Sequence, residues 1–189
     1  PVLITPVKEG TVVSEEKYQV HACEAEHSVP TFSFLFEEKE KPGTFYPEKA
    51  NSLGVPKGEL WHKLQQGEEV VIENKSIKPS EVMGPNVPGK KVGISGDTRP
   101  TKKLEEFFKN CDYLVFDSTF SDELKEKAVE SCHSTAKEAA TFAKNVNVSN
   151  LILTHFSARY KDENVLLDEA KTIHDSVIAA KDQLKINIA

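Results

Sequence analysis

The arrangement of apolar and polar positions divides the chain into three stretches of different character. In residues 1–36, short runs of β-branched and aromatic residues alternate with charged or turn-forming breaks, a pattern typical of β-strands. We predict strands at Val2–Ile4, Thr11–Val13, Gln19–Ala25 and Thr31–Phe36. The first stretch is therefore predicted to form part of a sheet.

Residues 37–91 carry a different pattern, because prolines and glycines interrupt the apolar runs. Such residues mark turns and end regular elements. The pattern predicts short helices at Pro47–Leu53 and Gly58–Gln65 and a short hairpin at Val70–Lys78. Only a thin apolar stripe accompanies them. We expect an insertion or protruding arm, with a mobile linker as the alternative.

From residue 90 onward, apolar runs alternate with segments of helical periodicity. The predicted strands are KKVGIS, DYLVFD, NLILT, Ser176–Ala180 and Leu184–Ile188. The predicted helices are Thr101–Lys109, Asp122–Glu130, Thr135–Lys144 and Asn164–Ile173. Strands that are apolar throughout and alternate with helices indicate a buried sheet covered by helices, which places the chain in the α/β class.

The amino-acid composition limits the class of protein, its compartment and its partners. The chain has 189 residues and a net charge of −6, with 38% hydrophobic and 29% charged residues, as in an ordinary globular protein. No apolar run is long enough to span a membrane. The three cysteines are scattered, which argues against a disulfide scaffold and favours a reducing compartment. The negative charge argues mildly against a nucleic-acid partner.

Polar side chains follow three of the predicted strands at the point where each strand ends. Asp97 follows KKVGIS, Asp117 ends DYLVFD, and His155 follows NLILT. Because ligand sites of layered α/β proteins form at the carboxyl ends of strands, these three side chains are expected to converge. Aspartate and neutral histidine are ordinary ligands of zinc and similar ions. The alternative is a helix-capping aspartate and a hydrogen-bonded structural histidine.

His133 gives a second signal, because it directly precedes a predicted helix start. Thr135 and Glu138 have the spacing of a capping box, and the N–H groups of a helix N-terminus attract anions. A histidine there could hold a phosphate or donate a proton to it. Alternatively, the hydroxyl groups cap the helix and His133 is a surface residue.

Five motifs occur in the order found in one enzyme family. They are EHSVPTFSF around His27, the Pro- and Gly-rich stretch of residues 43–91, SGDTRP around Asp97, CHSTAKEAA around His133 and LILTHFSARY around His155. Together they span almost the whole chain. The chain resembles the ribonuclease Z (tRNase Z) family, metallo-β-lactamase-fold endonucleases that trim the 3′ side of precursor tRNA.

The resemblance implies a centre with two zinc ions, other divalent ions being possible. His27 would bind one zinc, Asp97 would bridge both, and His155 would bind the second. His133 would protonate the leaving ribose oxygen, with Asp117 as the carboxylate that orients it. The phosphate-binding residues implied are Ser157, Arg159 and Thr98. The residues of the tRNA-binding arm implied are Gly54, Pro56, Lys57 and Gly58.

The same resemblance implies an organisation and partners. Residues 1–36 would supply strands of the β-lactamase core, residues 37–91 the flexible arm, and residues 92–189 the C-terminal α/β half. The substrate would be precursor tRNA, the assembly a homodimer, and the location cytoplasmic, with no membrane partner and an organelle as the alternative. Residues 43–91 hold seven lysines and six glutamates, a net charge of +1, so tRNA binding would depend on a few lysines, backbone groups and shape.

Two departures from the family pattern limit what is expected of this chain. The family often has His-Glu-Ala-Thr where this chain has Phe116-Asp117-Ser118-Thr119, and the hallmark His-x-His-x-Asp-His run does not occur. We therefore expect a C-terminal part of such an enzyme, with weak or single-metal binding and no hydrolysis by the chain alone. The alternatives are a non-catalytic tRNA-binding or assembly module with a remnant metal site, and another metallo-β-lactamase-fold hydrolase.

Overall fold

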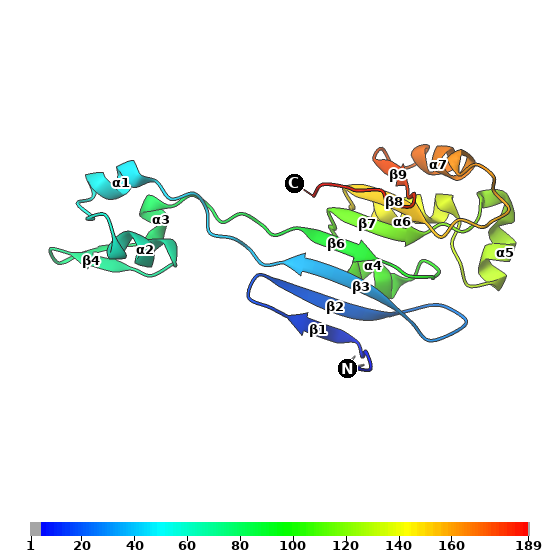
Figure 1. Ribbon diagram of the computed structural model, residues 1–189, viewed down its shortest axis with the longest axis horizontal. Coiled ribbons are helices and arrows are strands. Elements are labelled where there is room, and N and C mark those ends of the chain that lie inside the picture. Colours follow the sequence, from blue (N-terminus) through cyan, green and yellow to red (C-terminus); the bar gives the residue numbers. More distant parts are fainter. Residues whose placement is uncertain (1–4, 189) are drawn as a thin grey trace. The chain divides into compact units, whose positions relative to one another are not determined.

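The computed structural model describes residues 5–188, so the strand predicted at Val2–Ile4 lies outside the described residues. The chain forms two compact units (Figure 1). The first combines Pro1–Glu38 with Lys90–Ala189, and the second is Lys39–Gly89. Among the described residues, no helix has both the length and the apolar character that crossing a bilayer requires.

A seven-stranded sheet forms the centre of the first unit. Its strands, in spatial order, are β1 (Gly10–Ser14), β2 (Tyr18–Ala25), β3 (Thr31–Glu38), β6 (Lys91–Ile94), β7 (Tyr113–Asp117), β8 (Asn150–Thr154) and β9 (Val177–Ala179). The strands from β1 to β6 pair antiparallel, and those from β6 to β9 pair parallel. The carboxyl ends of β6, β7 and β8 therefore lie side by side at one edge.

Helices pack on one face of this sheet. They are α4 (Lys102–Phe107), α6 (Ala136–Asn145) and α7 (Asn164–Lys171). Helix α5 (Lys125–Glu130) follows a 3₁₀ turn at Asp122–Leu124 and packs against that turn. Residues of β7 and β8, such as Phe116 and Leu153, are fully buried in one core with residues of α4, α6 and α7. Alternate residues point to the opposite face, where Val115 is half-buried and Ile94 is 49% exposed.

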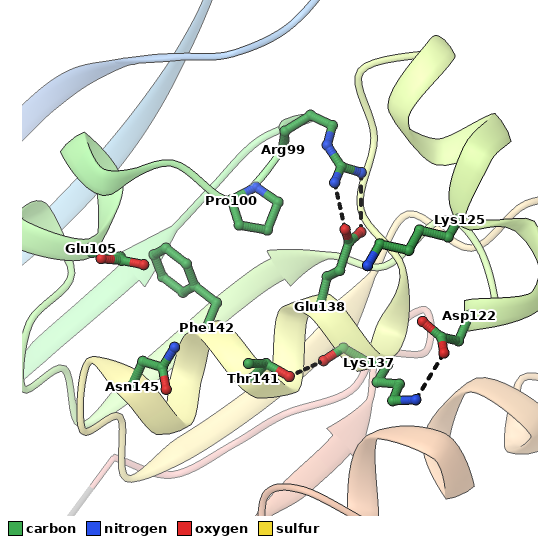
Figure 2. A pocket seen from close by; sticks show the side chains of 10 residues that line it. All are labelled: Arg99, Pro100, Glu105, Asp122, Lys125, Lys137, Glu138, Thr141, Phe142 and Asn145. Atoms are coloured by element: carbon green, nitrogen blue, oxygen red, sulfur yellow. Dashed lines mark hydrogen bonds and ion pairs between the residues drawn. The ribbon is translucent and has the colours of Figure 1, made fainter.

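Helix α6 shows how the sequence places one border of the site. Ala136, Ala139, Ala140 and Ala143 recur at helical spacing and are all fully buried. Thr135 caps the helix by accepting a hydrogen bond from the Glu138 backbone N–H, and the Glu138 carboxylate accepts one from Thr135 N–H. The first turn borders a pocket in which Glu138 meets Arg99 (Figure 2).

The second unit has a hydrophobic core of its own. It contains α1 (Pro47–Ser52), α2 (Glu59–Gln65), β4 (Val70–Ile72), β5 (Lys75–Ile77) and α3 (Pro79–Val82). Its buried residues are Ala50, Val55, Leu64, Val70, Ile77 and Val82. The two predicted helices and the hairpin are confirmed. The apolar positions form a closed core, more than the thin stripe expected, so this segment folds as a compact unit.

The strands and helices predicted for the first unit are confirmed where the structure describes them, with two corrections. Leu184–Ile188 is no strand. Its alternating pattern supplies apolar side chains, but a strand also needs a pairing partner, and this segment forms no ladder with the edge strand β9. The helix predicted from Asp122 begins as a 3₁₀ turn, and its α-helical part starts at Lys125.

Candidate functional site

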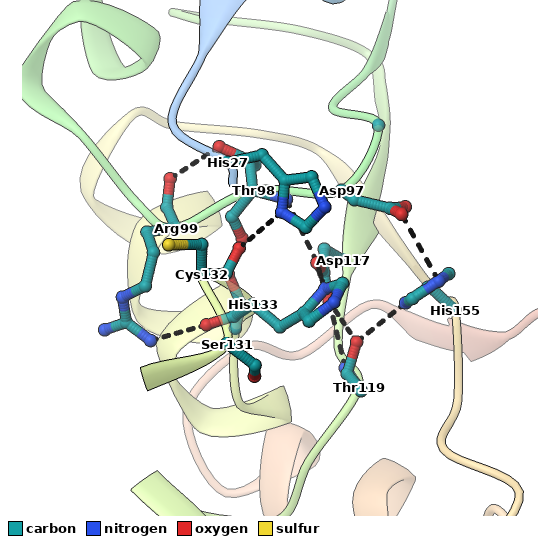
Figure 3. Close-up of polar contacts among 12 residues, drawn as sticks. His27, Asp97, Thr98, Arg99, Asp117, Thr119, Ser131, Cys132, His133 and His155 are labelled. Atoms are coloured by element: carbon teal, nitrogen blue, oxygen red, sulfur yellow. Dashed lines mark hydrogen bonds and ion pairs between the residues drawn. The ribbon is translucent and has the colours of Figure 1, made fainter. Parts of the chain in front are cut away.

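Four loops bring ionisable side chains to the carboxyl ends of the parallel strands (Figure 3). Asp97 follows β6, Asp117 is the last residue of β7, and His155 follows β8. His27 comes from the β2–β3 loop, which reaches the same edge because β3 runs antiparallel to β6. His133 precedes the capping residues of α6. The convergence expected from the strand ends is therefore present in the structure.

The side chains at this edge lie in direct contact. The Nε2 atom of His155 lies 3.4 Å from Oδ2 of Asp97. The imidazole of His133 lies between two others, with its ring centroid 4.9 Å from that of His27 and 4.8 Å from that of His155. The rings of His133 and His155 are nearly parallel, at 19°. The three imidazoles and one carboxylate thus form a single compact cluster.

Asp117 holds this cluster together from beneath. Its carboxylate is fully buried and accepts four hydrogen bonds. Oδ1 accepts from the backbone N–H and the hydroxyl of Thr119, at 3.0 and 2.7 Å. Oδ2 accepts from the backbone N–H of Thr98 at 3.0 Å and lies 2.7 Å from Nδ1 of His133. With every lone-pair direction in use, the ring proton of His133 belongs on Nδ1.

The same rule assigns the ring protons of the other two histidines. Nδ1 of His27 lies 3.1 Å from the carbonyl oxygen of Cys132, which can only accept. Nδ1 of His155 lies 2.8 Å from the hydroxyl of Thr119, whose own hydrogen goes to Asp117. Each imidazole therefore has its Nδ1 proton held by a protein acceptor. This leaves the Nε2 lone pairs available, as in histidines that bind metal ions.

Two backbone conformations at the site are unusual for their residue types. His155 has φ of 62° and Cys132 has φ of 56°, both in the left-handed region that favours glycine. His155 owes its position to this turn, since the chain leaves β8 one residue earlier. Non-glycine residues in this region are enriched at functional sites, where surrounding contacts impose the conformation.

The donor set suits a divalent metal ion. The ligand atoms of His27, Asp97 and His133 lie within 4.8 Å of one another, and so do those of Asp117, His133 and His155. In the second group Asp117 is already saturated by four donors, so it serves as a hydrogen-bond partner. In the first group, imidazole nitrogen and carboxylate oxygen are donors that zinc and similar ions accept. These residues could therefore hold a divalent ion.

The residues expected to bind phosphate fall into two kinds. Thr98 is fully buried, and its hydroxyl accepts from Glu26 N–H and donates to the Arg99 carbonyl. In the structure, this buried hydroxyl joins the loop after β2 to the loop after β6. Arg159 is exposed beside the cluster, its Nε donating to the hydroxyl of Ser157 at 3.0 Å and its guanidinium 5.1 Å from the Phe120 ring.

The predicted arm residues lie in the second unit. Gly54 and Gly58 have φ of 75° and 131°, which lets the chain turn at both ends of a short loop. Between them, Val55 is buried and its carbonyl accepts from the Trp61 indole N–H at 2.9 Å. Pro56 and Lys57 are exposed. The loop is thus anchored by one apolar side chain and displays the other residues to solvent.

The sequence left three supporting groups unassigned. Thr119 joins His155 to Asp117, the Cys132 carbonyl holds His27, and Arg99 pairs with Glu138 at 3.0 Å. For Thr119, the position two residues after a strand-end aspartate was an available signal. A backbone carbonyl leaves no mark in the sequence. Arg99 lay within the SGDTRP motif, but nothing local tied it to a residue 39 positions away.

Comparisons with known proteins agree with this arrangement. A family model described as the beta-lactamase superfamily domain matches residues 62–156, about half of the chain. The chain is 61% identical over 188 residues to a protein named Ribonuclease Z from Nitrosopumilus maritimus, covering 100% of the chain and 63% of that protein. It is 44% identical to a Ribonuclease Z from Methanosarcina acetivorans, covering 96% of the chain and 60% of that protein. The chain thus spans about three fifths of the length of the curated relatives it matches.

Solved structures support the fold. The chain matches human tRNase Z, short form, with a TM-score of 0.58 at 24% identity, covering 95% of this chain and 46% of that one. It matches the metallo-beta-lactamase fold protein YhfI from Bacillus subtilis with the same TM-score at 15% identity, covering 95% and 52%. The resemblance seen in the motifs is therefore confirmed by both kinds of comparison, and the chain belongs to the beta-lactamase superfamily, with the metallo-beta-lactamase fold.

Proposed function

We propose that the protein to which this chain belongs is a zinc-dependent endoribonuclease that removes the 3′ trailer from precursor tRNA. The observation that carries the proposal is the cluster of His27, Asp97, His133 and His155 at one sheet edge, with Nδ1 of each histidine at hydrogen-bond distance from a protein oxygen. The identity of 61% to a protein named Ribonuclease Z supports the choice of substrate.

In this proposal, His27, Asp97 and His155 are the metal ligands. Imidazole and carboxylate donors match the preference of zinc, and three protein ligands are the number that a catalytic zinc takes. The ligand atoms of His27 and Asp97 lie within 4.8 Å of each other, and Nε2 of His155 lies 3.4 Å from Oδ2 of Asp97, so Asp97 is the ligand that both histidines would have in common. We therefore expect weak binding, or binding of a single ion, by these residues. A bound divalent ion would supply Lewis-acid chemistry to a phosphoryl oxygen.

His133 is proposed to move a proton at the reacting phosphate. Its Nδ1 is committed to Asp117, so Nε2 is the atom that can take up a proton and release it to the leaving ribose oxygen. Asp117 keeps the ring oriented and stabilises the charged imidazole before transfer, as a buried carboxylate does for a catalytic histidine. The exposed guanidinium of Arg159, with Ser157, would neutralise phosphate charge.

The second unit is proposed as the tRNA-binding arm. The loop Gly54–Gly58, with Lys57 exposed, offers a cation and turn backbone groups to a phosphate. Shape and a few phosphate contacts are the usual means of holding a structured RNA. Homodimer formation and a cytoplasmic location remain predictions.

Cleavage of a precursor tRNA tests this function. A substrate labelled at its 5′ end and carrying a 3′ trailer is incubated with the protein as its cells make it, and with the 189-residue chain beside it. We expect the cell-made protein to shorten the RNA and the chain alone to leave it intact. His133→Ala and Asp97→Ala should abolish cleavage, whereas Lys137→Gln, on the exposed side of α6, should not.

Two results would count against the proposal. Binding of tRNA without cleavage by the cell-made protein would favour a non-catalytic module, and hydrolysis of small esters alone would favour another hydrolase.

The zinc content of the purified chain tests the metal assignment. We expect up to one ion per chain, lost in His27→Ala and in His155→Ala, and retained in Lys137→Gln.

A further inference from the structure

Arg99 makes a set of contacts that no role described so far explains. Its guanidinium forms a two-pronged ion pair with Glu138, in which Nη1 lies 3.0 Å from Oε2 and Nη2 lies 2.5 Å from Oε1. Both side chains line the pocket shown in Figure 2, and they are only 14% and 15% exposed. Nη1 also donates to the backbone carbonyl oxygen of His133 at 2.5 Å (Figure 3).

These contacts join three loops of the candidate site. The backbone N–H of Arg99 donates to the carbonyl of Glu26, directly before His27. The guanidinium holds the backbone of His133, and Glu138 holds the guanidinium while capping α6 through the N–H of Thr135. A shift of Arg99 would therefore be transmitted to the imidazoles of both His27 and His133.

We propose that Arg99 is a positioning residue that holds His133 against Asp117, and that Glu138 orients Arg99 for this task. The inference rests on the proposed function for the catalytic role of His133, whereas the contacts of Arg99 are independent of that role. The backbone carbonyl of His133 is the point of attachment, so the ring can swing away from Asp117 once the guanidinium is lost. Asp117 would then face a different donor or none.

Arginine suits this position for a physical reason. The planar guanidinium offers several N–H donors in a fixed fork, which lets one group bind a carboxylate through two bonds and still reach a carbonyl. A lysine ammonium at the same place is a single point charge on a flexible stem. It could keep the charge attraction to Glu138 but would not hold the carbonyl of His133 at a defined angle.

A neighbouring ion pair provides a matched control. Lys137 and Asp122 lie 2.8 Å apart on the outer side of α6, with side chains 50% and 36% exposed. Lys137→Gln removes the same charge as Arg99→Gln, from the residue next to Glu138, without touching His133. Glu138→Gln is the second useful change, because glutamine also serves in a capping box and so leaves the helix start intact.

The test reads the tautomer of His133 by nitrogen-15 NMR of the 189-residue chain at pH 7. The wild type should carry its ring proton on Nδ1. We expect Arg99→Gln and Glu138→Gln to give a mixture of the two tautomers, Arg99→Lys to fall between, and Lys137→Gln to match the wild type. Backbone amide spectra show whether each variant is folded. If Arg99→Gln does not fold, the His133 tautomer in the milder Glu138→Gln variant provides the test.

Kinetics on the cell-made protein complete the test. Arg99→Lys should lower kcat for precursor tRNA by about 10-fold or more with KM nearly unchanged, because misplacing a catalytic group by a fraction of an ångström has such effects. An unaltered His133 tautomer in Arg99→Gln and Glu138→Gln would overturn the inference. If the wild type cleaves no tRNA, the proposed function fails, while the NMR result still decides the positioning role.

Discussion

The candidate site residues of the first unit are held by other protein groups, whereas the candidate binding residues of the second unit are displayed on its surface. Asp117 accepts four hydrogen bonds at zero exposure, and each of the three histidines has a partner for Nδ1. In Lys39–Gly89, by contrast, Lys57 and Pro56 are exposed, and the buried positions are purely apolar.

This difference separates two kinds of sensitivity. In the first unit, stability and chemistry depend on the same side chains, since the groups that would act on a phosphate also satisfy buried donors. In the second unit, stability belongs to an apolar core and binding to residues outside it. Trp61 is the only tryptophan and lies in the second unit, so its fluorescence reports that unit separately.

The largest effect is expected at Asp117. In Asp117→Asn, an NH₂ group replaces one of the two carboxylate oxygens. In place of Oδ2, it faces the N–H of Thr98 and Nδ1–H of His133, and both donors lose their acceptor. Each buried donor left without an acceptor costs about 1–3 kcal/mol, so we expect the free energy of unfolding of the first unit to fall by about 4 kcal/mol. Urea denaturation followed by circular dichroism measures it. A Trp61 transition that moves equally would show that the two units unfold together.

Leu64→Ala should destabilise the second unit and leave the candidate site in the first unit unchanged. Leu64 is fully buried in α2, and truncating such a side chain costs about 3 kcal/mol. A unit of this size has little stability to lose, so we expect the Trp61 emission to shift at much lower urea while the His133 tautomer is unchanged. Glu59→Ala, at an exposed position on the same helix, is the control and should have almost no effect.

Alkaline pH should weaken the first unit alone. Burial raises the pKa of the Cys111 thiol from its ordinary 9.0 to about 12, so the folded state keeps a proton that the unfolded chain loses. Stability is therefore complete below pH 9 and falls as the pH rises toward 12, by about 1.4 kcal/mol at pH 10. The second unit contains no cysteine. Comparing urea midpoints at pH 8 and 10 measures the difference, which Cys111→Ala should largely remove.

The smallest effect on stability, and the most specific, is expected at Lys57. Lys57→Ala should change unfolding by less than about 0.5 kcal/mol, because the side chain is exposed. Its tRNA affinity should fall and the salt dependence of binding should decrease by about one unit, as for a lost phosphate contact. Lys75→Ala, also exposed in this unit, controls for net charge. An equal decrease in both variants would contradict a specific role of Lys57.

The parallel strands of the first unit were predictable because each is a short apolar run between helical segments, and the meeting of Asp97, Asp117 and His155 followed from parallel strands ending together. The roles of these residues stay predictions. The supporting contacts were not predictable, since the Cys132 carbonyl is a backbone group and Arg99 finds Glu138 only through the tertiary fold. Leu184–Ile188 failed as a strand because side-chain pattern alone does not provide a pairing partner.

His155 carries a consequence for how such a chain changes over generations. At φ of 62°, glycine would adopt the backbone of that turn more readily than histidine does, so the residue present is a poor choice for folding. Selection for stability alone would favour His155→Gly, and the imidazole beside Asp97 would be lost. Persistence of a histidine there among descendants would therefore record selection for the site and not for the fold.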